Sequence, residues 1–120
     1  MQAVKFQVSK FTSYKDLPLD QLHARKYSIY IIDYDWNYLY ANRHAISTFA
    51  GVDPTGKNIR RIWEENAGIN FEPVYNLLRN YVAEKKPFDL KSRSPLTKKA
   101  IEIVGHPLGD CYYFSIYELP

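Results

Sequence analysis

The stretch from residue 27 to residue 66 constrains the fold most, because two strand-like runs and two helix-like runs follow one another with turn residues between them. Residues 27–33 are rich in β-branched and aromatic side chains, which predicts a strand. Residues 33–37 supply turn chemistry, and residues 38–41 return as the second strand of a hairpin. The sequence therefore predicts a sheet that begins with a hairpin.

The residues after this hairpin predict two helices. Asn42 is placed to cap a helix that begins at residue 43, because its side-chain oxygen can accept a hydrogen bond from an unpaired helical N–H. Gly51 is expected to end that helix. Asp53 and Pro54 are expected to cap and open the next helical segment, whose apolar residues have helical spacing over residues 57–65.

The second half of the chain predicts one amphipathic helix and three strands. Residues 71–86 place their apolar side chains on one side and their charges on the other, and Pro87 stops this helix. Strand-like runs follow at residues 87–93, 97–105 and 111–119. Two strands, helices and then three strands predict an α+β fold, with a five-stranded antiparallel sheet and helices packed on one face.

Residues 1–26 are expected to form an N-terminal cap or extension of a domain that spans residues 27–120. Residues 1–12 alternate weakly between apolar and polar, which suits a short strand or an extended arm. Asp20 can open a short helix that Pro18 limits. Lysines interrupt the apolar residues of the N-terminus, so no signal peptide is predicted.

The composition narrows the class of function. A chain of 120 residues, 46% hydrophobic and 24% charged, is expected to be one soluble domain. No apolar run approaches the ~20 residues needed to span a bilayer, and a cytoplasmic location is the default expectation. The net charge of +3 is spread over separate basic pairs, so neither a nucleic acid nor a membrane is an expected partner. A single cysteine excludes an internal disulfide framework.

The pattern of residues 27–119 resembles the PAS family of sensory domains. Five pieces of the family pattern occur in order. They are an Asp at the end of the first strand, a hydrophobic-x-Asn end of the second, an Ala in the next helix, the Gly that closes it, and a Gly-x-x-hydrophobic helix start. In this sequence they are Asp33, Tyr40-Ala41-Asn42, Ala45, Gly51 and Gly56-Lys57-Asn58-Ile59.

This resemblance implies a position for a ligand. In the PAS family, ligands lie between the inner face of the sheet and the long helix with its neighbouring segment. The implied ligand-binding residues are Ile31, Ile59, Ile62, Trp63, Phe71, Val74, Tyr75, Leu78, Ile101, Ile103 and Phe114. Among them, Trp63 is a residue on which a non-covalently bound flavin could stack. The alternative is a core that these large side chains fill completely.

The cofactor of such a site stays unknown from the sequence. The region that aligns with the cysteine of flavin-photoadduct PAS domains reads Ile62-Trp63-Glu64-Glu65-Asn66, which excludes photoadduct chemistry. Cys111 opens the last strand and does not lie in the middle region where photoactive yellow protein holds its chromophore. Residues 71–86 contain no histidine for haem. The three histidines have no metal-ligand spacing, and surface or turn positions are expected for His23, His44 and His106.

Three functions are compatible with this pattern. We expect a sensory PAS module that binds a small ligand, or dimerises, or both, to regulate a signalling partner such as a histidine kinase or a response regulator. The alternative is a ligand-free protein–protein interaction domain that dimerises, in which residues 1–26 pack across the outer face of the sheet or against a second copy, and a homodimer is expected. A small enzyme of the ketosteroid isomerase-like fold is the third. That fold starts with long helices, and the acid pairs 33/35 and 64/65 have simpler turn and helix-end roles, so no enzyme is expected.

Overall fold

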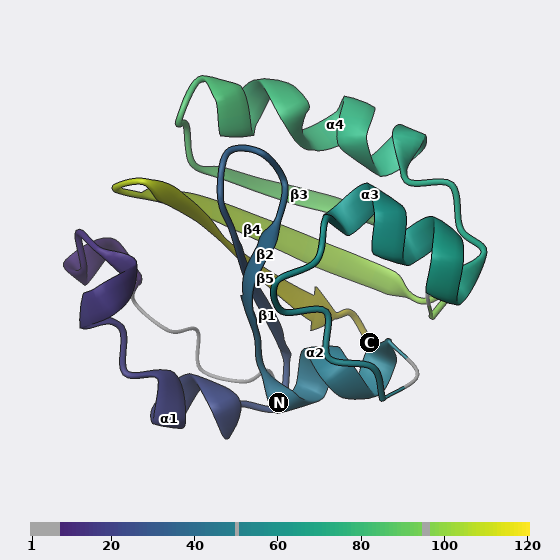
Figure 1. Cartoon of the computed structure of the whole chain (residues 1–120), viewed down its shortest axis with the longest axis horizontal. Coiled ribbons are helices and arrows are strands. Elements are labelled where there is room, and N and C mark those ends of the chain that lie inside the picture. The colour runs from purple at the N-terminus through teal and green to yellow at the C-terminus, as the bar shows by residue number, and fades with distance from the viewer. Residues whose placement is uncertain (1–7, 50, 95–96) are drawn as a thin grey trace.

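The computed structural model describes residues 8–49, 51–94 and 97–120. Five strands form one antiparallel sheet in the order β2-β1-β5-β4-β3 (Figure 1). Their bounds are β1 Ser28–Ile32, β2 Tyr38–Ala41, β3 Phe88–Arg93, β4 Ala100–Leu108 and β5 Cys111–Glu118. The predicted α+β fold with a five-stranded antiparallel sheet is confirmed.

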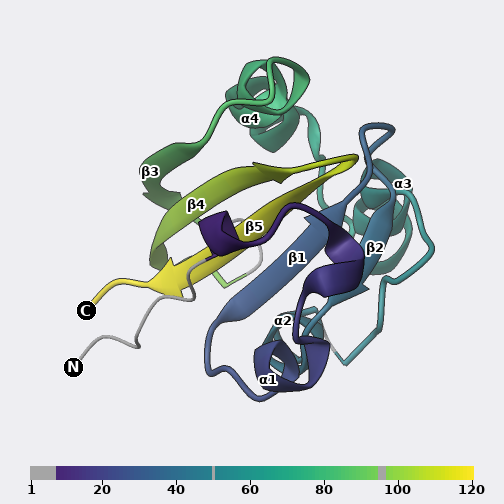
Figure 2. The same cartoon turned by 90° about the vertical axis from the view of Figure 1, so that its left-hand side faces the viewer.

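Helices cover both sides of this sheet, and those on the two sides come from different parts of the chain (Figures 1 and 2). One side carries α2 (Arg43–Thr48), α3 (Ile59–Ile62), a π-helical turn (Trp63–Ala67) and α4 (Glu72–Ala83). The other side carries the cap segment, defined here as residues 8–26, with two 3₁₀ turns (Val8–Lys10 and Tyr14–Asp16) and α1 (Leu19–His23). Within the predicted strand or arm of residues 1–12, residues 8–10 form a 3₁₀ turn, and residues 1–7 lie outside the described residues.

Strand β1 separates two cores because successive side chains point to opposite faces of a sheet. Tyr30 and Ile32 pack with α2, α3 and α4, on the side that we call the helix face. Ile29 and Ile31 pack with the cap segment, on the side that we call the cap face. All four side chains are buried, so β1 is apolar on both faces. A central strand that is buried on both faces has a continuous hydrophobic sequence. The alternation of apolar and polar residues is then absent and cannot reveal on which face each side chain lies.

Asn42 joins the cap segment to the sheet and to α2. Its side-chain oxygen accepts hydrogen bonds from the backbone N–H groups of Ile29 and Ala45, both at 3.0 Å. Its side-chain amide donates to the carbonyl oxygens of Leu22 at 3.0 Å and Tyr27 at 2.9 Å. The bond from Ala45 is the predicted N-cap of α2. The fully buried amide thus has all four of its hydrogen-bonding positions occupied.

Two local predictions were wrong. Asp53 and Pro54 do not open a helix, because the Asp53 side chain instead accepts hydrogen bonds from the backbone and the hydroxyl of Thr55 and forms a turn. Helix α3 begins after Asn58, which caps it. Strand β4 runs beyond residue 105 as far as Leu108, although it contains Pro107. Strand β3 begins at Phe88, opposite residue 105, and does not extend alongside Pro107, so this proline has a strand neighbour on one side only.

Candidate ligand-binding site

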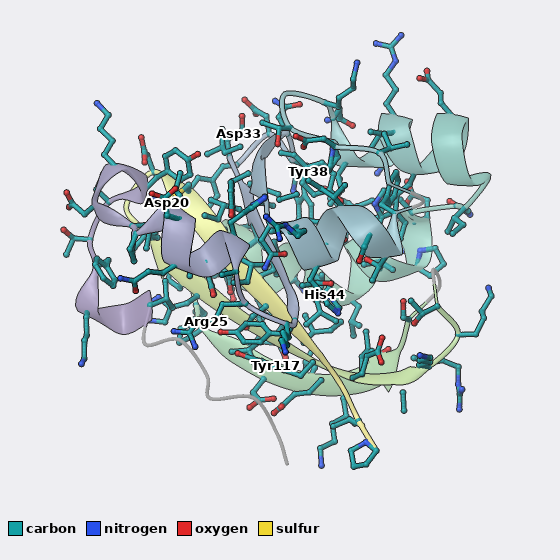
Figure 3. All side chains as sticks on the ribbon, turned by 90° about the horizontal axis from the view of Figure 1, so that it is seen from below. Asp20, Arg25, Asp33, Tyr38, His44 and Tyr117 are labelled. Atoms are coloured by element: carbon teal, nitrogen blue, oxygen red, sulfur yellow. The ribbon has the colours of Figure 1, made fainter. Side chains whose placement is uncertain are left out.

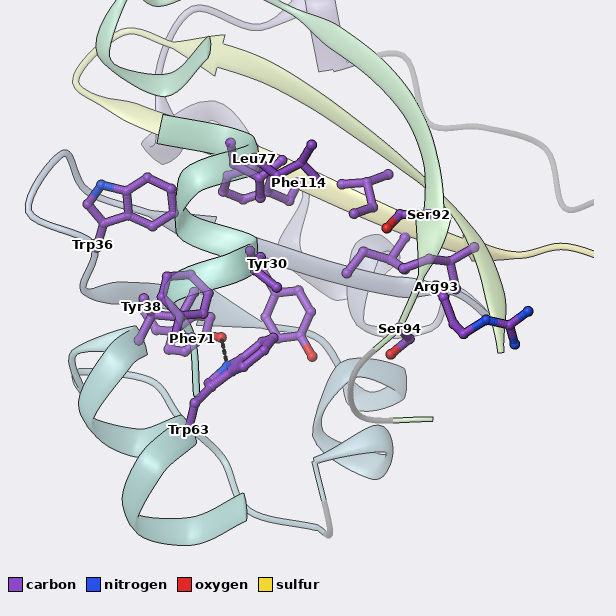
Figure 4. Close-up of a pocket in the computed structure, with 16 residues that line it drawn as sticks. Tyr30, Trp36, Tyr38, Trp63, Phe71, Leu77, Ser92, Arg93, Ser94 and Phe114 are labelled. Atoms are coloured by element: carbon purple, nitrogen blue, oxygen red, sulfur yellow. Dashed lines mark hydrogen bonds between the residues drawn. The ribbon is translucent and has the colours of Figure 1, made fainter. Parts of the chain in front are cut away.

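A cavity of about 80 Å³ lies between the helix face of the sheet and the segment that runs from α3 to α4 (Figure 4). Aromatic side chains form much of its wall, aliphatic side chains complete it, and a few polar residues lie at one end. The wall consists of Tyr30, Trp36, Tyr38, Ile59, Trp63, Phe71, Val74, Leu77, Leu78, Ser92, Arg93, Ser94, Ile101, Ile103, Phe114 and Ile116. Protein interiors rarely leave voids larger than a water molecule, so the cavity needs an explanation.

The aromatic part of the wall is held by edge-to-face packing. The ring of Phe71 lies 4.9 Å from that of Trp63 and 5.8 Å from that of Trp36, measured between centroids, and both pairs are edge-on. Such geometry is favourable because the positive edge of one ring meets the negative face of the other. Phe71 is the residue before α4, so these contacts fix where that helix begins relative to the hairpin and to α3.

A buried hydrogen bond crosses the wall of the cavity. The indole Nε1–H of Trp63 donates to the Tyr38 hydroxyl at 3.0 Å (Figure 4). Burial, and next the neighbouring Tyr30, raises the pKa of Tyr38 well above its usual value, so this hydroxyl stays neutral. Among the residues that the structure describes, no acceptor takes the proton of the Tyr38 hydroxyl. This proton is therefore available to a hydrogen-bond acceptor in the cavity.

Trp36 closes the cavity from the hairpin turn. The Asp33 side chain accepts hydrogen bonds from the backbone N–H groups of residues 35 and 37, both at 2.9 Å, and so shapes this turn. Trp36 adopts a left-handed backbone with φ of 64°, which is unfavourable for a bulky residue. Its side chain lines the cavity and two open hollows on the outer side, which it shares with Tyr75. The indole thus lies between the interior and solvent.

No family model matches this sequence, and no curated protein matches it. Several solved structures match it closely in shape. The photoactive yellow protein domain from the sensor histidine kinase Ppr from Rhodospirillum centenum is 14% identical, with a TM-score of 0.59 over 85% of this chain and 94% of that chain. The PAS domain of the Cronobacter turicensis RpfR quorum-sensing receptor in complex with BDSF is 11% identical, with a TM-score of 0.61 over 80% of this chain and 96% of that chain. This chain has the PAS fold.

A third structure supports the same conclusion. The sensory box sensor histidine kinase from Vibrio cholerae is 18% identical, with a TM-score of 0.57 over 84% of this chain and 85% of that chain. At such identities the likeness extends to the PAS fold and not to a ligand or a partner. The PAS fold that the sequence pattern around Asn42 and Gly51 predicts is confirmed.

The PAS fold places eight of the eleven predicted site residues on the cavity wall. They are Ile59, Trp63, Phe71, Val74, Leu78, Ile101, Ile103 and Phe114. Ile62 is buried in the core of the helix face but is not part of this wall, and Tyr75 lines the outer hollows. Ile31 lies on the cap face, so its predicted place on the ligand side of the sheet is wrong. A shift of one residue in β1 exchanges the two faces, and Tyr30 takes the place that we gave to Ile31.

Sequence reasoning missed the other wall residues for separate reasons. Ile116 follows from Phe114, because two positions along β5 return to the same face. Trp36 belongs to a turn, for which no strand or helix period predicts a direction. Ser92, Arg93 and Ser94 enter from the end of β3, and the guanidinium of Arg93 points away from the cavity and donates to the Lys98 carbonyl at 2.7 Å (Figure 4).

The acid pairs lie apart from the cavity. Asp33 shapes the hairpin turn, away from His44 on α2 (Figure 3). Glu64 is exposed, and Glu65 pairs with Arg61 at 3.0 Å on the surface. Within residues 8–49, 51–94 and 97–120, no three His, Cys, Asp or Glu side chains gather closely enough to hold a metal ion. In the same part of the chain, every helix is too short or too polar to cross a membrane.

Proposed function

We propose that this chain is a sensory PAS module that binds a small, mainly apolar molecule in the cavity between the helix face and α3–α4. The single observation that carries this proposal is the 80 Å³ cavity with its aromatic wall. Concave, mostly apolar sites with a few convergent polar groups are typical of small-molecule binding. The match to domains of a sensor histidine kinase and a quorum-sensing receptor supports a role in signalling.

The volume of the cavity limits the ligand. Pockets for drug-sized molecules and cofactors measure roughly 300–1,000 Å³, well above the volume found here. A dry cavity of about 150 Å³ accepts benzene in another protein, so a molecule of that size fits here only if the wall moves slightly. We therefore propose a ligand much smaller than a flavin or a haem, in a site whose wall adjusts to it. The RpfR domain in complex with BDSF is an example of a PAS domain with a bound molecule.

The output of the module is proposed to pass through a partner. A histidine kinase, a response regulator or a second copy of this chain are the candidates, and we propose that the module has no catalytic activity of its own and acts in the cytoplasm. Apolar residues of the cap segment, Val8, Leu17 and Leu22, are buried against the sheet of the same chain. For residues 8–26, this packing favours an N-terminal segment that lies across the outer face of its own sheet over one that packs against a second copy.

Native mass spectrometry of the freshly purified protein, with its absorption spectrum, tests this function first. Extra mass on the folded protein is the expected result. Benzene added to the protein provides a second test, because it should raise the melting temperature of the wild type. The variant Ile103→Phe fills the cavity and should abolish that rise. A clean apo mass together with no response to benzene would contradict the proposal. Analytical ultracentrifugation then decides between a second copy and another partner.

A further inference from the structure

The helix face changes from aromatic to polar along its strands. Along β1 this face carries Ile32, Tyr30 and then Ser28, because side chains alternate along a strand. Along β5 it carries, in chain order, Tyr112, Phe114, Ile116 and Glu118. Ser28 pairs with Ile116, so the polar ends of both strands lie at the same end of the sheet. A molecule in the cavity therefore meets a polar surface towards the Ser28 end of the sheet, in addition to the single hydroxyl of Tyr38 in the wall.

A second, smaller hollow of about 30 Å³ occupies this polar end. Its lining combines hydroxyl, imidazole and carboxylate groups with part of the cavity wall. The polar lining residues are Ser28, His44, Thr48, Thr97 and Glu118. The residues shared with the aromatic cavity are Tyr30, Ser94, Ile101 and Ile116. Because these four residues line both spaces, the two hollows adjoin one another.

The polar hollow has hydrogen-bonding capacity to offer. The Ser28 hydroxyl and His44 Nδ1 lie 3.0 Å apart and are hydrogen-bonded to one another, while the Thr48 hydroxyl donates to the Ala45 carbonyl at 2.9 Å. A hydroxyl oxygen has two lone pairs and one proton, so each of these hydroxyls can accept a further hydrogen bond. A space of this volume holds roughly one or two heavy atoms, since a water needs about 10–15 Å³. The hollow therefore suits the polar head group of a molecule and not a whole ligand.

Charge indicates which head group fits. Among the described residues that line the hollow, Glu118 is the one acidic residue and none is Lys or Arg; the exposed Glu118 carboxylate pairs with Lys99 Nζ at 3.4 Å. A carboxylate head group in the hollow would therefore lose its hydration without gaining a Lys or Arg partner among the lining residues, which is unfavourable. An uncharged hydroxyl can donate and accept hydrogen bonds there without that cost.

We infer that the ligand is a slender amphiphile, with an apolar part in the aromatic cavity and an uncharged hydroxyl head beside Ser28, His44 and Thr48. This inference rests on the proposed function, because it extends the same cavity. Tyr30 lies between the two parts of the site and donates its hydroxyl proton to the Ala45 carbonyl at 3.5 Å, the upper limit for a hydrogen bond. Its ring is buried and lies 5.4 Å from that of Tyr38, between centroids, so a ligand that spans both spaces has to displace the Tyr30 side chain.

Amide NMR titrations with three probes test the inference. The probes are 1-hexanol, sodium hexanoate at pH 8, where the carboxyl group is ionised, and benzene, which has no head group. We expect 1-hexanol to bind at least tenfold more tightly than hexanoate. The variant Ser28→Ala should weaken 1-hexanol about fivefold, as the loss of one neutral hydrogen bond does, and should leave benzene binding unchanged.

The matched control is Ser115→Ala. Ser115 is also a buried serine of the same sheet. It pairs with Ile29, and its side chain therefore lies on the cap face. This control should leave the binding of all three probes unchanged. Thr48→Val removes a second hydroxyl at nearly equal volume and should also weaken 1-hexanol alone, which keeps the test valid if Ser28→Ala folds poorly.

The outcomes separate the two proposals. Equal or tighter binding of hexanoate would overturn the uncharged head group. Binding of 1-hexanol that neither Ser28→Ala nor Thr48→Val weakens would overturn its position. In both cases benzene would still bind, and the proposed sensory cavity would stand. If neither benzene nor 1-hexanol binds, the cavity itself is not a ligand site and both proposals fail.

Discussion

The two faces of the same sheet use their buried side chains differently. On the cap face, Leu22, Ile29 and Ile31 have no exposed surface, and the four hydrogen bonds of Asn42 join the cap segment, through Leu22, to β1 and α2. On the helix face, large aromatic rings meet edge-on around a cavity that Trp36 closes in a strained turn. One strand, β1, contributes alternate residues to both.

This contrast separates the side of the sheet that stabilises the fold from the side on which we propose ligand binding. Close packing and the four hydrogen bonds of Asn42 stabilise the fold on the cap face, whereas the cavity on the helix face forgoes the van der Waals contacts that would fill it. On the helix face these van der Waals contacts are missing, as is expected where a bound ligand would supply them. If the two faces differ in this way, substitutions on the cap face should change mainly the free energy of unfolding, and substitutions at the cavity should change mainly ligand binding.

The largest effect is expected from Asn42→Ala. The substitution leaves the backbone N–H groups of Ile29 and Ala45 without the Asn42 oxygen, and it removes the cap of α2. The carbonyl groups of Leu22 and Tyr27 also lose a bond, although Leu22 still accepts one from Arg25 N–H. Because each buried unpaired group costs about 1–3 kcal/mol, partly relieved by relaxation and water entry, we expect a loss of about 4 kcal/mol in the free energy of unfolding. Urea denaturation followed by circular dichroism measures it.

Asn58→Ala is the matched control for this substitution. Asn58 also caps a helix, through a longer bond of 3.4 Å from Arg61 N–H, but it is only half-buried and water can replace its bonds. We expect a loss of about 1 kcal/mol, the usual effect of removing an N-cap. Equal losses for the two asparagines would mean that the buried hydrogen bonds of the cap face add nothing beyond helix capping.

The next effect, about 3 kcal/mol, is expected from Gly105→Ala on the helix face. An added Cβ would lie 2.7 Å from Cδ1 of Phe88, a ring that other aromatic side chains surround, so the strand and the ring cannot both keep their places. The control Gly51→Ala meets no atom within 4 Å but has φ of 77°, and should cost about 1 kcal/mol from the backbone alone.

A second substitution distinguishes a clash from a loss of strand structure at this position. Adding Phe88→Leu to Gly105→Ala makes room for the Cβ, so the double variant should be more stable than the two single losses added together predict. Thermal unfolding of the four proteins measures this coupling. Additive losses would show that the helix face is loosely packed even beside residue 105, and the contrast between the faces would then be one of degree.

A smaller effect, about 2 kcal/mol, is expected from Ile31→Phe, and it tests the assignment of the faces directly. Overfilling a packed position usually costs about 1–3 kcal/mol, and Ile31 lies in the filled core of the cap face. Ile103→Phe makes the same exchange at the cavity wall, where the ring has space, and should change stability by less than about 1 kcal/mol. The opposite order of the two losses would return Ile31 to the cavity side.

The sequence predicted those parts of the fold that depend on neighbouring residues. Asn42 was recognisable as a helix cap because its partner Ala45 lies three positions ahead. Its bonds to Leu22 and Tyr27 join segments 15 to 20 residues apart, and no local pattern indicates them. The order of strands and helices was readable for the same reason, since each element carries its own period and its own ends.

The candidate site was predictable only in part. Phe71, Val74 and Leu78 followed from the apolar side of one helix, which has a single possible inward direction. Ile31 and Tyr30 are both buried members of an entirely buried strand, so alternation could not decide between them. Trp36 lies in a turn with a left-handed backbone, which neither a helix nor a strand pattern predicts.

The smallest effect is expected at alkaline pH and concerns Cys111 on the cap face. Burial, and next the Asp110 carboxylate, raises the pKa of its thiol from 9.0 to about 11. Between these values the unfolded chain loses the thiol proton while the folded chain keeps it, so ionisation favours unfolding and stability falls as pH rises. The stabilising effect is complete below pH 9, and this group should account for a loss of about 1 kcal/mol between pH 9 and pH 10.

Urea denaturation of the wild type and of Cys111→Ala, at pH values from 8 to 11, measures this contribution. The variant should lose the part of the decline that begins near pH 9. It should keep the part that begins above pH 10, where unfolded tyrosines ionise while burial holds the pKa of Tyr117 at about 12. If the two proteins decline in parallel from pH 9, water reaches residue 111 in the folded state. The cap face would then not be the sealed side of the sheet, and the comparison of the two faces would have to be reversed.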